Sequence, residues 1–413
     1  MEKRRVVITG MGAVTPLGHT VQETWDAVRA GACGIAPITL YDHSSQKVSL
    51  AAEVKDFDPT RVLDKKEARR MDRFTQFAVT AAVEAMAQSG LDLEREDTSR
   101  MGVSVSSGIG GISTIQSCCE SGQSRGFDKV SPFFIPMAIS NLAAGHIAIR
   151  FGLHGMCISP VAACAGGSNA LGDAFLHIRD GYAEVMVAGG AEASITPLAI
   201  GGFTSMSALT TASDPARASI PFDAERSGFV MGEGAAILVL EELEHARARG
   251  AQILGEITGY GATCDAYHIT APDPAGAWSA ACMEQALADA GTAPEAVDYI
   301  NAHGTSTPLN DSGETAAIRK VFGGHADRLM VSSTKSMTGH LLGASGAVEA
   351  VFCVLALKDS FVPATIHYQV PDPACDLDIV PNEGRQADIH CALSDSLGFG
   401  GHNTCLVFQK WEG

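Results

Sequence analysis

One cysteine and two histidines lie in loops of small residues from which they could do chemistry together. Cys164 ends a short apolar run and is followed by Gly166 and Gly167, after which apolar residues recur at helical spacing. This pattern predicts a turn that opens into a helix, with the thiol at the helix N-terminus and room for a substrate beside the glycines. Backbone N–H groups and the dipole at that end favour the thiolate, so we expect a lowered thiol pKa and a nucleophilic sulfur. The alternative is a buried cysteine that acts as a small hydrophobic residue.

The two histidines lie in the second half of the chain. His303 occupies the segment 299–308 (YINAHGTSTP), at the end of a predicted strand, where side chains project into a cleft. His340 occupies the small-residue loop 333–346, which runs into a helix that carries Glu349. Either histidine alone would more often be a hydrogen-bonded structural group. A nucleophile together with two loop histidines indicates nucleophilic catalysis instead.

The composition excludes several classes of protein. With 413 residues, 46% of them hydrophobic, the chain is long enough for two domains or one large duplicated domain. Eleven cysteines, an odd number without a CxxC pair, argue against a disulfide framework or a zinc site and favour the reducing cytoplasm. The apolar run behind the basic N-terminus is too short for a signal peptide, and the most apolar helix, 347–357, is too short to span a bilayer. A net charge of −18 disfavours nonspecific binding to nucleic acids or acidic membranes.

The elements around the three residues indicate an α/β protein. Residues 72–90 form an amphipathic helix pattern that stops at a glycine, and residues 102–107 predict a strand that breaks at 108–111. The segments 184–190 and 235–240 are apolar enough for strands buried on both faces. Residues 5–9 predict a strand that leads into a turn at 10–13. That turn lacks the third glycine of a dinucleotide fingerprint, and Pro16 breaks the helix that should follow, so we interpret it as structural.

An internal repeat predicts a duplicated architecture. The segment ITGMGA at 8–13 returns as ITGYGA at 257–262, and a helix ending in glycine and a strand ending in Xaa-Gly follow in the same order in both places. We therefore expect two similar βα halves, 1–250 and 251–413, joined at a charged helix over 241–250. If the halves pack face to face, catalytic groups distant in sequence meet in one cleft.

Four segments together resemble the condensing-enzyme family, and in particular the elongating β-ketoacyl-[acyl carrier protein] synthases of dissociated fatty-acid synthesis. They are the cysteine loop, NAHGTST at 301–307, KSMTGH at 335–340 and GFGG at 398–401, and the resemblance extends from Arg5 to Phe408. It implies a thiolase-like αβαβα five-layer fold and a homodimer. It also implies a reaction in which an acyl group moves from acyl carrier protein to the cysteine, malonyl-acyl carrier protein loses CO2, and its carbanion attacks the acyl thioester. No resident cofactor is implied, because the carrier protein brings its own phosphopantetheine.

The resemblance also implies a role for each site residue. The backbone N–H groups of Cys164 and Phe399 would hold the tetrahedral oxyanion, and neutral His303 and His340 would stabilise the enolate formed by decarboxylation. Lys335 would keep His340 neutral and be balanced by Glu349; without the resemblance, this pair would be interpreted as a surface ion pair. The positions that would bind the pantetheine arm, line the acyl pocket or flank the gating phenylalanine are Thr270, Thr305, Thr307, Ile109, Phe203 and Gly400.

A local basic cluster on this acidic chain fits docking of an acidic carrier protein. Its residues are Lys65, Lys66, Arg69 and Arg70, extended by Arg125 and Lys129; the alternative is a solvated helix start. The sequence departs from the family pattern at Ala162, Asp395 and His402, and no basic residue follows Gly202-Phe203. These departures leave the chemistry intact but bear on carrier-protein affinity and chain length.

Other functions remain open at this level. A ketosynthase of an aromatic polyketide or nodulation-factor pathway would share the fold and the active residues. A thiolase would carry a second cysteine within 398–401, and a non-condensing partner subunit would lack the nucleophile, so the sequence argues against both. A Cys-His hydrolase and a binding module without chemistry are the remaining alternatives.

Overall fold

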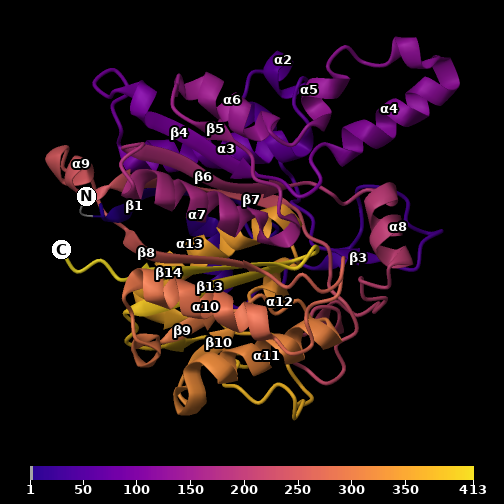
Figure 1. The fold of residues 1–413 in the computed structure, drawn as a ribbon. Helices are drawn as coiled ribbons and strands as arrows, with labels where there is room; N and C mark the ends of the chain where they lie inside the picture. The colour runs from indigo at the N-terminus through magenta and orange to yellow at the C-terminus, as the bar shows by residue number, and fades with distance from the viewer. Residues whose placement is uncertain (1–2) are drawn as a thin grey trace.

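A computed structural model describes residues 3–413 and contains one large mixed sheet of ten strands (Figure 1). In spatial order they are β10 (Met330–Ser332), β9 (Tyr299–Asn301), β13 (Cys391–Gly398), β14 (His402–Gln409), β8 (Gly255–Cys264), β1 (Val6–Val14), β7 (Gly234–Glu242), β6 (Val185–Glu192), β4 (Met101–Ser106) and β5 (Cys157–Ile158). The sheet divides where β1 and β8 pair over only three residues each.

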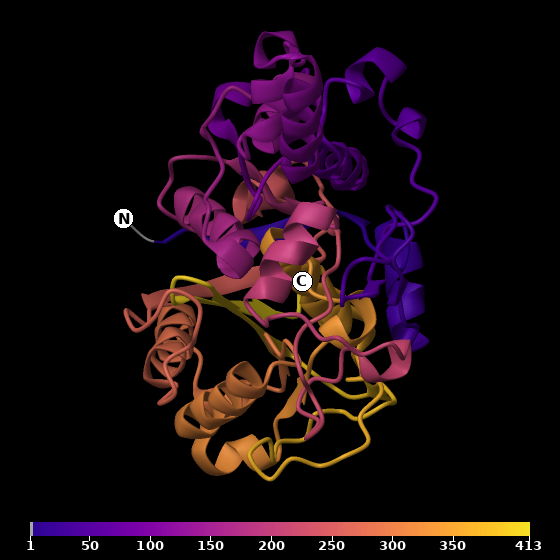
Figure 2. The ribbon, with the colours of Figure 1, turned by 90° about the vertical axis from the view of Figure 1, so that its right-hand side faces the viewer.

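The two halves of the sheet are arranged alike about this junction. Outward from the junction, the order β1-β7-β6-β4-β5 in one half corresponds to β8-β14-β13-β9-β10 in the other. Helices α3 (Arg73–Ser89) and α10 (Ala277–Ala290) cover the outer faces, whereas α7 (Gly166–Arg179) and α13 (Ser345–Asp359) lie between the half-sheets (Figures 1 and 2). This gives five layers of helix, sheet, helix, sheet and helix, as the family resemblance implied.

The repeated glycines have a packing role in both halves. A Cβ atom on Gly12 of β1 would lie 1.9 Å from the Ala81 carbonyl oxygen of α3, and one on Gly261 of β8 would lie 2.1 Å from the Cys282 carbonyl oxygen of α10. Each outer helix can therefore approach its strand only where the strand lacks a side chain.

The predicted turn at 10–13 is wrong, because these residues continue strand β1 to Val14.

The remaining helices and strands complete the layers and the surface. They are α1 (Val21–Arg29), α2 (Lys65–Ala68), α4 (Ile112–Arg125), α5 (Phe134–Ala138), α6 (Leu142–Phe151), α8 (Pro197–Ser205), α9 (Leu243–Ala248), α11 (Pro308–Phe322), α12 (Lys335–Thr338), and the pairs β2 (Ala36–Pro37) with β3 (Leu50–Ala51) and β11 (Phe361–Val362) with β12 (Arg385–Gln386). The predicted helix at 241–250 is shorter than expected, since β7 runs on to Glu242 and only Leu243–Ala248 is helical. Within residues 3–413, no helix is long and apolar enough to cross a membrane.

Candidate active site

Cys164 lies in a single 3-10 turn, Ala163–Ala165, directly before α7, as the sequence predicted. The preceding Ala163 adopts a left-handed φ of 48°, which turns the chain sharply from β5 into the helix. The neighbouring glycines do not make room for substrate. A Cβ on Gly166 would lie 2.1 Å from the Ser106 hydroxyl, and one on Gly167 would lie 2.9 Å from the Gly343 carbonyl oxygen. They therefore serve close packing between α7, β4 and the turn before α13.

A cavity of about 90 Å³ brings the nucleophile and both histidines together. The ring centroids of His303 and His340 are 5.3 Å apart, with the ring planes nearly perpendicular. Among the other predicted residues, those that line this cavity are Phe399, Phe203, Thr270, Thr305 and Thr307. Ile109 and Gly400 are not among its lining residues; Ile109 packs instead against the apolar cluster that includes Cys164.

Both histidines are neutral in this environment. Burial lowers the pKa of His303 and of His340 well below the usual value, and the charge of Lys335 lowers it further. The Nδ1 atom of His340 lies 2.9 Å from the Ser345 hydroxyl, while Nδ1 of His303 is buried without a hydrogen-bond partner. Neutral imidazoles can each accept a proton or donate one N–H.

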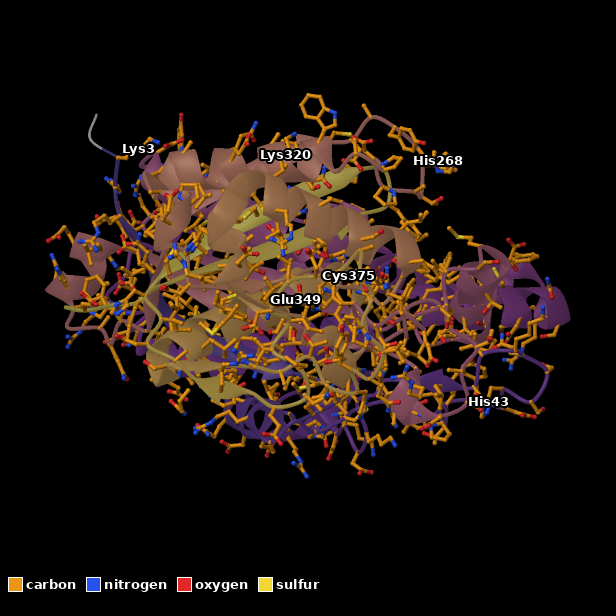
Figure 3. The ribbon with its side chains drawn as sticks, turned by 90° about the horizontal axis from the view of Figure 1, so that it is seen from below. Lys3, His43, His268, Lys320, Glu349 and Cys375 are labelled. Carbon is orange, nitrogen blue, oxygen red and sulfur yellow. The ribbon has the colours of Figure 1, made fainter. Side chains whose placement is uncertain are left out.

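Lys335 and Glu349 form an ion pair with side chains that are only 1% and 3% exposed. The alternative of a surface pair is therefore wrong. In Figure 3, Glu349 lies in the densely packed middle of the molecule, whereas His268 and Lys320 lie at its edge. Burial raises the pKa of Glu349, and Lys335 opposes that rise, so each charge depends on the other.

The environment of the thiol differs from the sequence-based expectation. Burial raises the pKa of Cys164 to about 12, and this effect outweighs the opposing charge of Lys335 and the backbone N–H groups of Phe399 and Cys164. The thiol of the free protein therefore carries its proton at neutral pH and needs an acceptor during attack. The same two N–H groups are directed at the sulfur, where they can also stabilise an oxyanion.

Two buried carboxylates that sequence reasoning missed hold the loops of the site. Glu314 on α11 accepts the backbone N–H groups of His303 at 2.6 Å and Gly304 at 2.8 Å. Glu192 at the end of β6 accepts the N–H groups of Gly108 at 2.7 Å and Gly343 at 3.1 Å. Glu314 lies on the buried face of α11, near Ala317 and Ile318. An acidic residue there needs buried donors.

The loop that carries Phe399 connects β13 to β14 beside the cavity. Gly400 and Gly401 have left-handed φ values of 91° and 78°, which favour glycine at both positions. The Gly400 N–H donates to the Ile269 carbonyl at 2.9 Å, and the Asp265 N–H donates to the Gly401 carbonyl at 2.8 Å. The loop is thus held by the segment that follows β8, and the Phe399 ring lies 6.2 Å from that of Phe203.

The predicted basic residues lie on and directly after α2, at the end of α4 and in the turn that follows α4. Lys65, Lys66, Arg69, Arg70, Arg125 and Lys129 are all exposed. The Arg70 guanidinium lies 4.9 Å from the Phe133 ring centroid, which connects α2 to the segment before α5. No basic residue directly follows Phe203, and Met206 in this stretch is 47% exposed.

Asp395, another departure from the family pattern, is buried, and burial raises its pKa to about 7. Across residues 3–413, no group of three or more His, Cys, Asp or Glu side chains is placed to hold a metal ion.

Comparisons with known proteins agree with this geometry. The family model described as "Beta-ketoacyl synthase, N-terminal domain" matches residues 3–246, and "Beta-ketoacyl synthase, C-terminal domain" matches residues 254–369. The chain therefore belongs to the beta-ketoacyl synthase family, and it has the family's thiolase-like fold.

Individual relatives narrow the class further. The chain is 52% identical to "3-oxoacyl-[acyl-carrier-protein] synthase 2" of Synechocystis sp., over 100% of this chain and 99% of that protein. It is also 52% identical to the protein of the same name from Staphylococcus aureus strain COL, over 100% of this chain and 99% of that one. It is a condensing enzyme.

Solved structures give the same class. One chain of the structure described as "type II PKS acyl-carrier protein in complex with its ketosynthase bound to the hexaketide" superposes on this chain with a TM-score of 0.92 at 36% identity. The match covers 99% of this chain and 100% of that one. The ishigamide ketosynthase/chain length factor superposes with a TM-score of 0.93 at 36% identity and the same coverage.

Proposed function

We propose that the chain elongates fatty acids by condensing an acyl group held on Cys164 with malonyl-acyl carrier protein, giving 3-oxoacyl-acyl carrier protein and CO2. One observation carries the proposal: a single cavity contains the Cys164 thiol, two neutral imidazoles and two backbone N–H groups directed at the sulfur. The names of the relatives that are 52% identical support the same substrate class.

In the first half-reaction, the sulfur of Cys164 attacks the thioester carbonyl of the acyl carrier protein. The thiol proton passes to a neighbouring neutral imidazole as the S–C bond forms, because burial disfavours a free thiolate beforehand. The N–H groups of Cys164 and Phe399 hold the oxyanion. The intermediate then expels the carrier-protein thiol, which takes up the proton, and leaves an acyl-enzyme.

In the second half-reaction, the bond between the malonyl carboxylate and its α-carbon breaks, and CO2 leaves. The electron pair moves into the thioester as an enolate, whose oxygen accepts N–H donors from His303 and His340. The α-carbon then attacks the acyl carbonyl on Cys164, and the cysteine sulfur leaves as a thiolate, which takes up a proton from water. Burial keeps both imidazoles neutral and available as single N–H donors, and the charge of Lys335 adds to this effect.

The remaining predicted residues bind the carrier protein and its arm in this proposal. Thr270, Thr305 and Thr307 contact the arm along the cavity, and the exposed basic cluster on α2 contacts the acidic carrier protein. Phe399 opens and closes the passage to Cys164 on its glycine-flanked loop.

Turnover tests this function directly. Medium-chain acyl-acyl carrier protein and malonyl-acyl carrier protein are mixed with the enzyme, and the product is identified by mass spectrometry. A 3-oxoacyl product two carbons longer than the starting acyl chain supports elongation. A poly-β-keto product from malonyl units would favour a polyketide pathway, and hydrolysis without condensation would overturn the proposal.

We also propose a homodimer in the cytoplasm, formed through edge strand β5 and the surfaces of α5 and α6. Apolar side chains there are strongly exposed, including Ile135 at 58%, Ile149 at 77% and Val161 at 58%. Sedimentation velocity should give twice the chain mass, and Ile149→Asp with Val161→Asp should give the monomer mass. All eleven cysteines are free in the described part of the chain, which fits a reducing compartment.

A further inference from the structure

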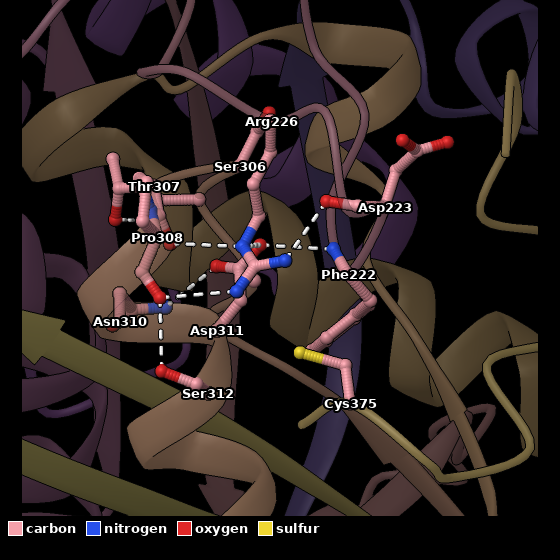
Figure 4. Close-up of polar contacts among 12 residues, drawn as sticks. Phe222, Asp223, Arg226, Ser306, Thr307, Pro308, Asn310, Asp311, Ser312 and Cys375 are labelled. Atoms are coloured by element: carbon pink, nitrogen blue, oxygen red, sulfur yellow. Dashed lines mark hydrogen bonds and ion pairs between the residues drawn. The ribbon is translucent and has the colours of Figure 1, made fainter. Parts of the chain in front are cut away.

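A buried arginine outside the cavity holds the loop that would bind the substrate arm. Arg226 is only 8% exposed and lies in the segment between α8 and β7. Its Nε donates to the Thr307 carbonyl at 3.3 Å, and its Nη2 donates to the Pro308 carbonyl at 3.1 Å. These carbonyls lie at the start of α11, one and two residues beyond Ser306, which separates the two cavity-lining threonines Thr305 and Thr307. Figure 4 shows the guanidinium beside these carbonyls and the Asp311 carboxylate.

Two carboxylates keep the guanidinium in place. Nη1 donates to Asp372 at 2.6 Å, and Nε lies 3.5 Å from Asp311. Burial alone would lower the pKa of Arg226, but these carboxylates more than offset it, and the pKa is raised. Asp311 also accepts the backbone N–H of Thr305, so the carboxylate that faces Arg226 is bonded to the loop as well.

The loop has further anchors along its length. At its end, the Thr307 carbonyl also accepts the Asp311 N–H at 3.2 Å, and the Pro308 carbonyl accepts the Ser312 hydroxyl at 2.9 Å. Glu314 holds the beginning of the loop through His303 and Gly304, and the Ser306 hydroxyl accepts the Ile220 N–H at 3.0 Å. Among the side chains of the described residues, only that of Arg226 donates to both the Thr307 and the Pro308 carbonyls. The hydroxyls of Thr305 and Thr307 lie 2.9 Å apart and face the cavity as a pair.

We infer that Arg226 is a positioning residue for arm recognition: through the Thr307 and Pro308 carbonyls, it sets the two threonine hydroxyls where the substrate arm binds. The rigid fork of a guanidinium can satisfy both carbonyls and both carboxylates at once, whereas a lysine ammonium is a single point of charge. The inference rests on the proposed function, because it assigns the arm of a carrier-protein substrate to this loop.

The test compares Arg226→Lys with the wild-type enzyme on two substrates. One is acyl-acyl carrier protein, which has the amide-bearing arm; the other is the S-ethyl thioester of the same acid, which lacks it. We expect the KM for the carrier-protein substrate to rise about tenfold with little change in kcat, since one charged hydrogen-bonding group is worth roughly that factor. The rate of Cys164 acylation by the S-ethyl thioester should stay within about twofold of wild type.

Arg217 provides a matched control from the same segment. It pairs with Asp223 and Glu225 and donates to the His367 carbonyl, and none of its hydrogen bonds or ion pairs within the described residues reaches the threonine loop. Arg217→Lys should leave the KM for both substrates unchanged. Asp372→Asn, which removes an outer partner of Arg226 without touching the loop, should raise the KM less than Arg226→Lys does.

The outcomes separate the two claims. If wild type forms no acyl-enzyme from carrier-protein substrate, the proposed function fails. If wild type does and Arg226→Lys keeps a normal KM, the arginine does not position the arm site. If both substrates slow equally in Arg226→Lys, its role is general to the fold, and the inference is again overturned.

Discussion

Replacing Glu314 by alanine should both destabilise the protein and displace His303. The carboxylate is 1% exposed and accepts two backbone N–H groups, at 2.6 and 2.8 Å. Alanine leaves both donors buried without a partner. Each such donor costs about 1–3 kcal/mol, so we expect the free energy of unfolding to fall by about 2–6 kcal/mol. Glu314→Gln keeps one acceptor oxygen and should lose about half as much.

The pH dependence gives this prediction a sign. Burial raises the pKa of Glu314 from 4.5 to about 8, so the folded protein binds a proton that the unfolded chain has released over that interval. Wild-type stability should therefore fall as the pH rises from about 4.5 to about 8, by about 1.4 kcal/mol per pH unit from this group. Glu314→Ala lacks the group, so the stability gap between the two proteins should narrow across the same interval.

Urea unfolding of both proteins at several pH values measures this gap, with exposed Glu295→Ala as the control. In Glu314→Ala, the rate of malonyl-acyl carrier protein decarboxylation should fall further than the rate of acyl transfer to Cys164, because His303 moves and the sulfur does not. Wild-type stability and wild-type decarboxylation in Glu314→Ala would refute the assigned role.

Three further predictions concern packing and charge. Gly261→Ala should lower the free energy of unfolding by about 1–3 kcal/mol, measured as a lower urea midpoint, because the added Cβ would lie 2.1 Å from a backbone oxygen of α10. Gly313→Ala in helix α11 is the control and should leave the midpoint unchanged, because open space surrounds Gly313. Lys335→Met should raise the pKa of both site histidines, so the acid limb of the pH–rate profile for decarboxylation should move to higher pH; an unmoved limb would contradict the charge argument. His245 has a raised pKa because two carboxylates face it, so the stability it provides should be present below its unfolded pKa of about 6.5 and lost as the pH rises through the folded value. His245→Gln should accordingly flatten the pH dependence of unfolding near neutrality, and an unchanged curve would count against it.

The loops of the site could be predicted from the sequence because each functional residue and the small residues that shape its loop are adjacent in the chain. The turn before α7, the two histidine loops and the gate each combine one functional side chain with small neighbours, which permit the tight turns that such loops need. The duplication was also visible, since both outer helices need glycines at the same places in β1 and β8.

The supporting residues could not be predicted, because their contacts cross long sequence distances and end on backbone atoms. Arg226 reaches carbonyls more than 80 residues away, and Glu192 reaches the N–H of Gly343 at a separation of 151 residues. No side-chain pattern marks such partners. The pKa of Cys164 was mispredicted for a related reason, since the helix terminus is local but burial depends on the whole fold.

The same limit applies to the glycines at 10–13. Paired glycines usually indicate a turn, yet here they mark a strand that a helix approaches closely. Only the position of α3 distinguishes the two cases.

Intact-protein mass spectrometry tests the central claim most directly. The enzyme is incubated with medium-chain acyl-acyl carrier protein, with Cys164→Ala in parallel, and malonyl-acyl carrier protein is then added. We expect an added mass equal to the acyl group on wild type alone, which disappears as the product two carbons longer forms. If wild type acquires no adduct, or if Cys164→Ala acquires the same one, Cys164 is not the nucleophile and the account of this site is contradicted.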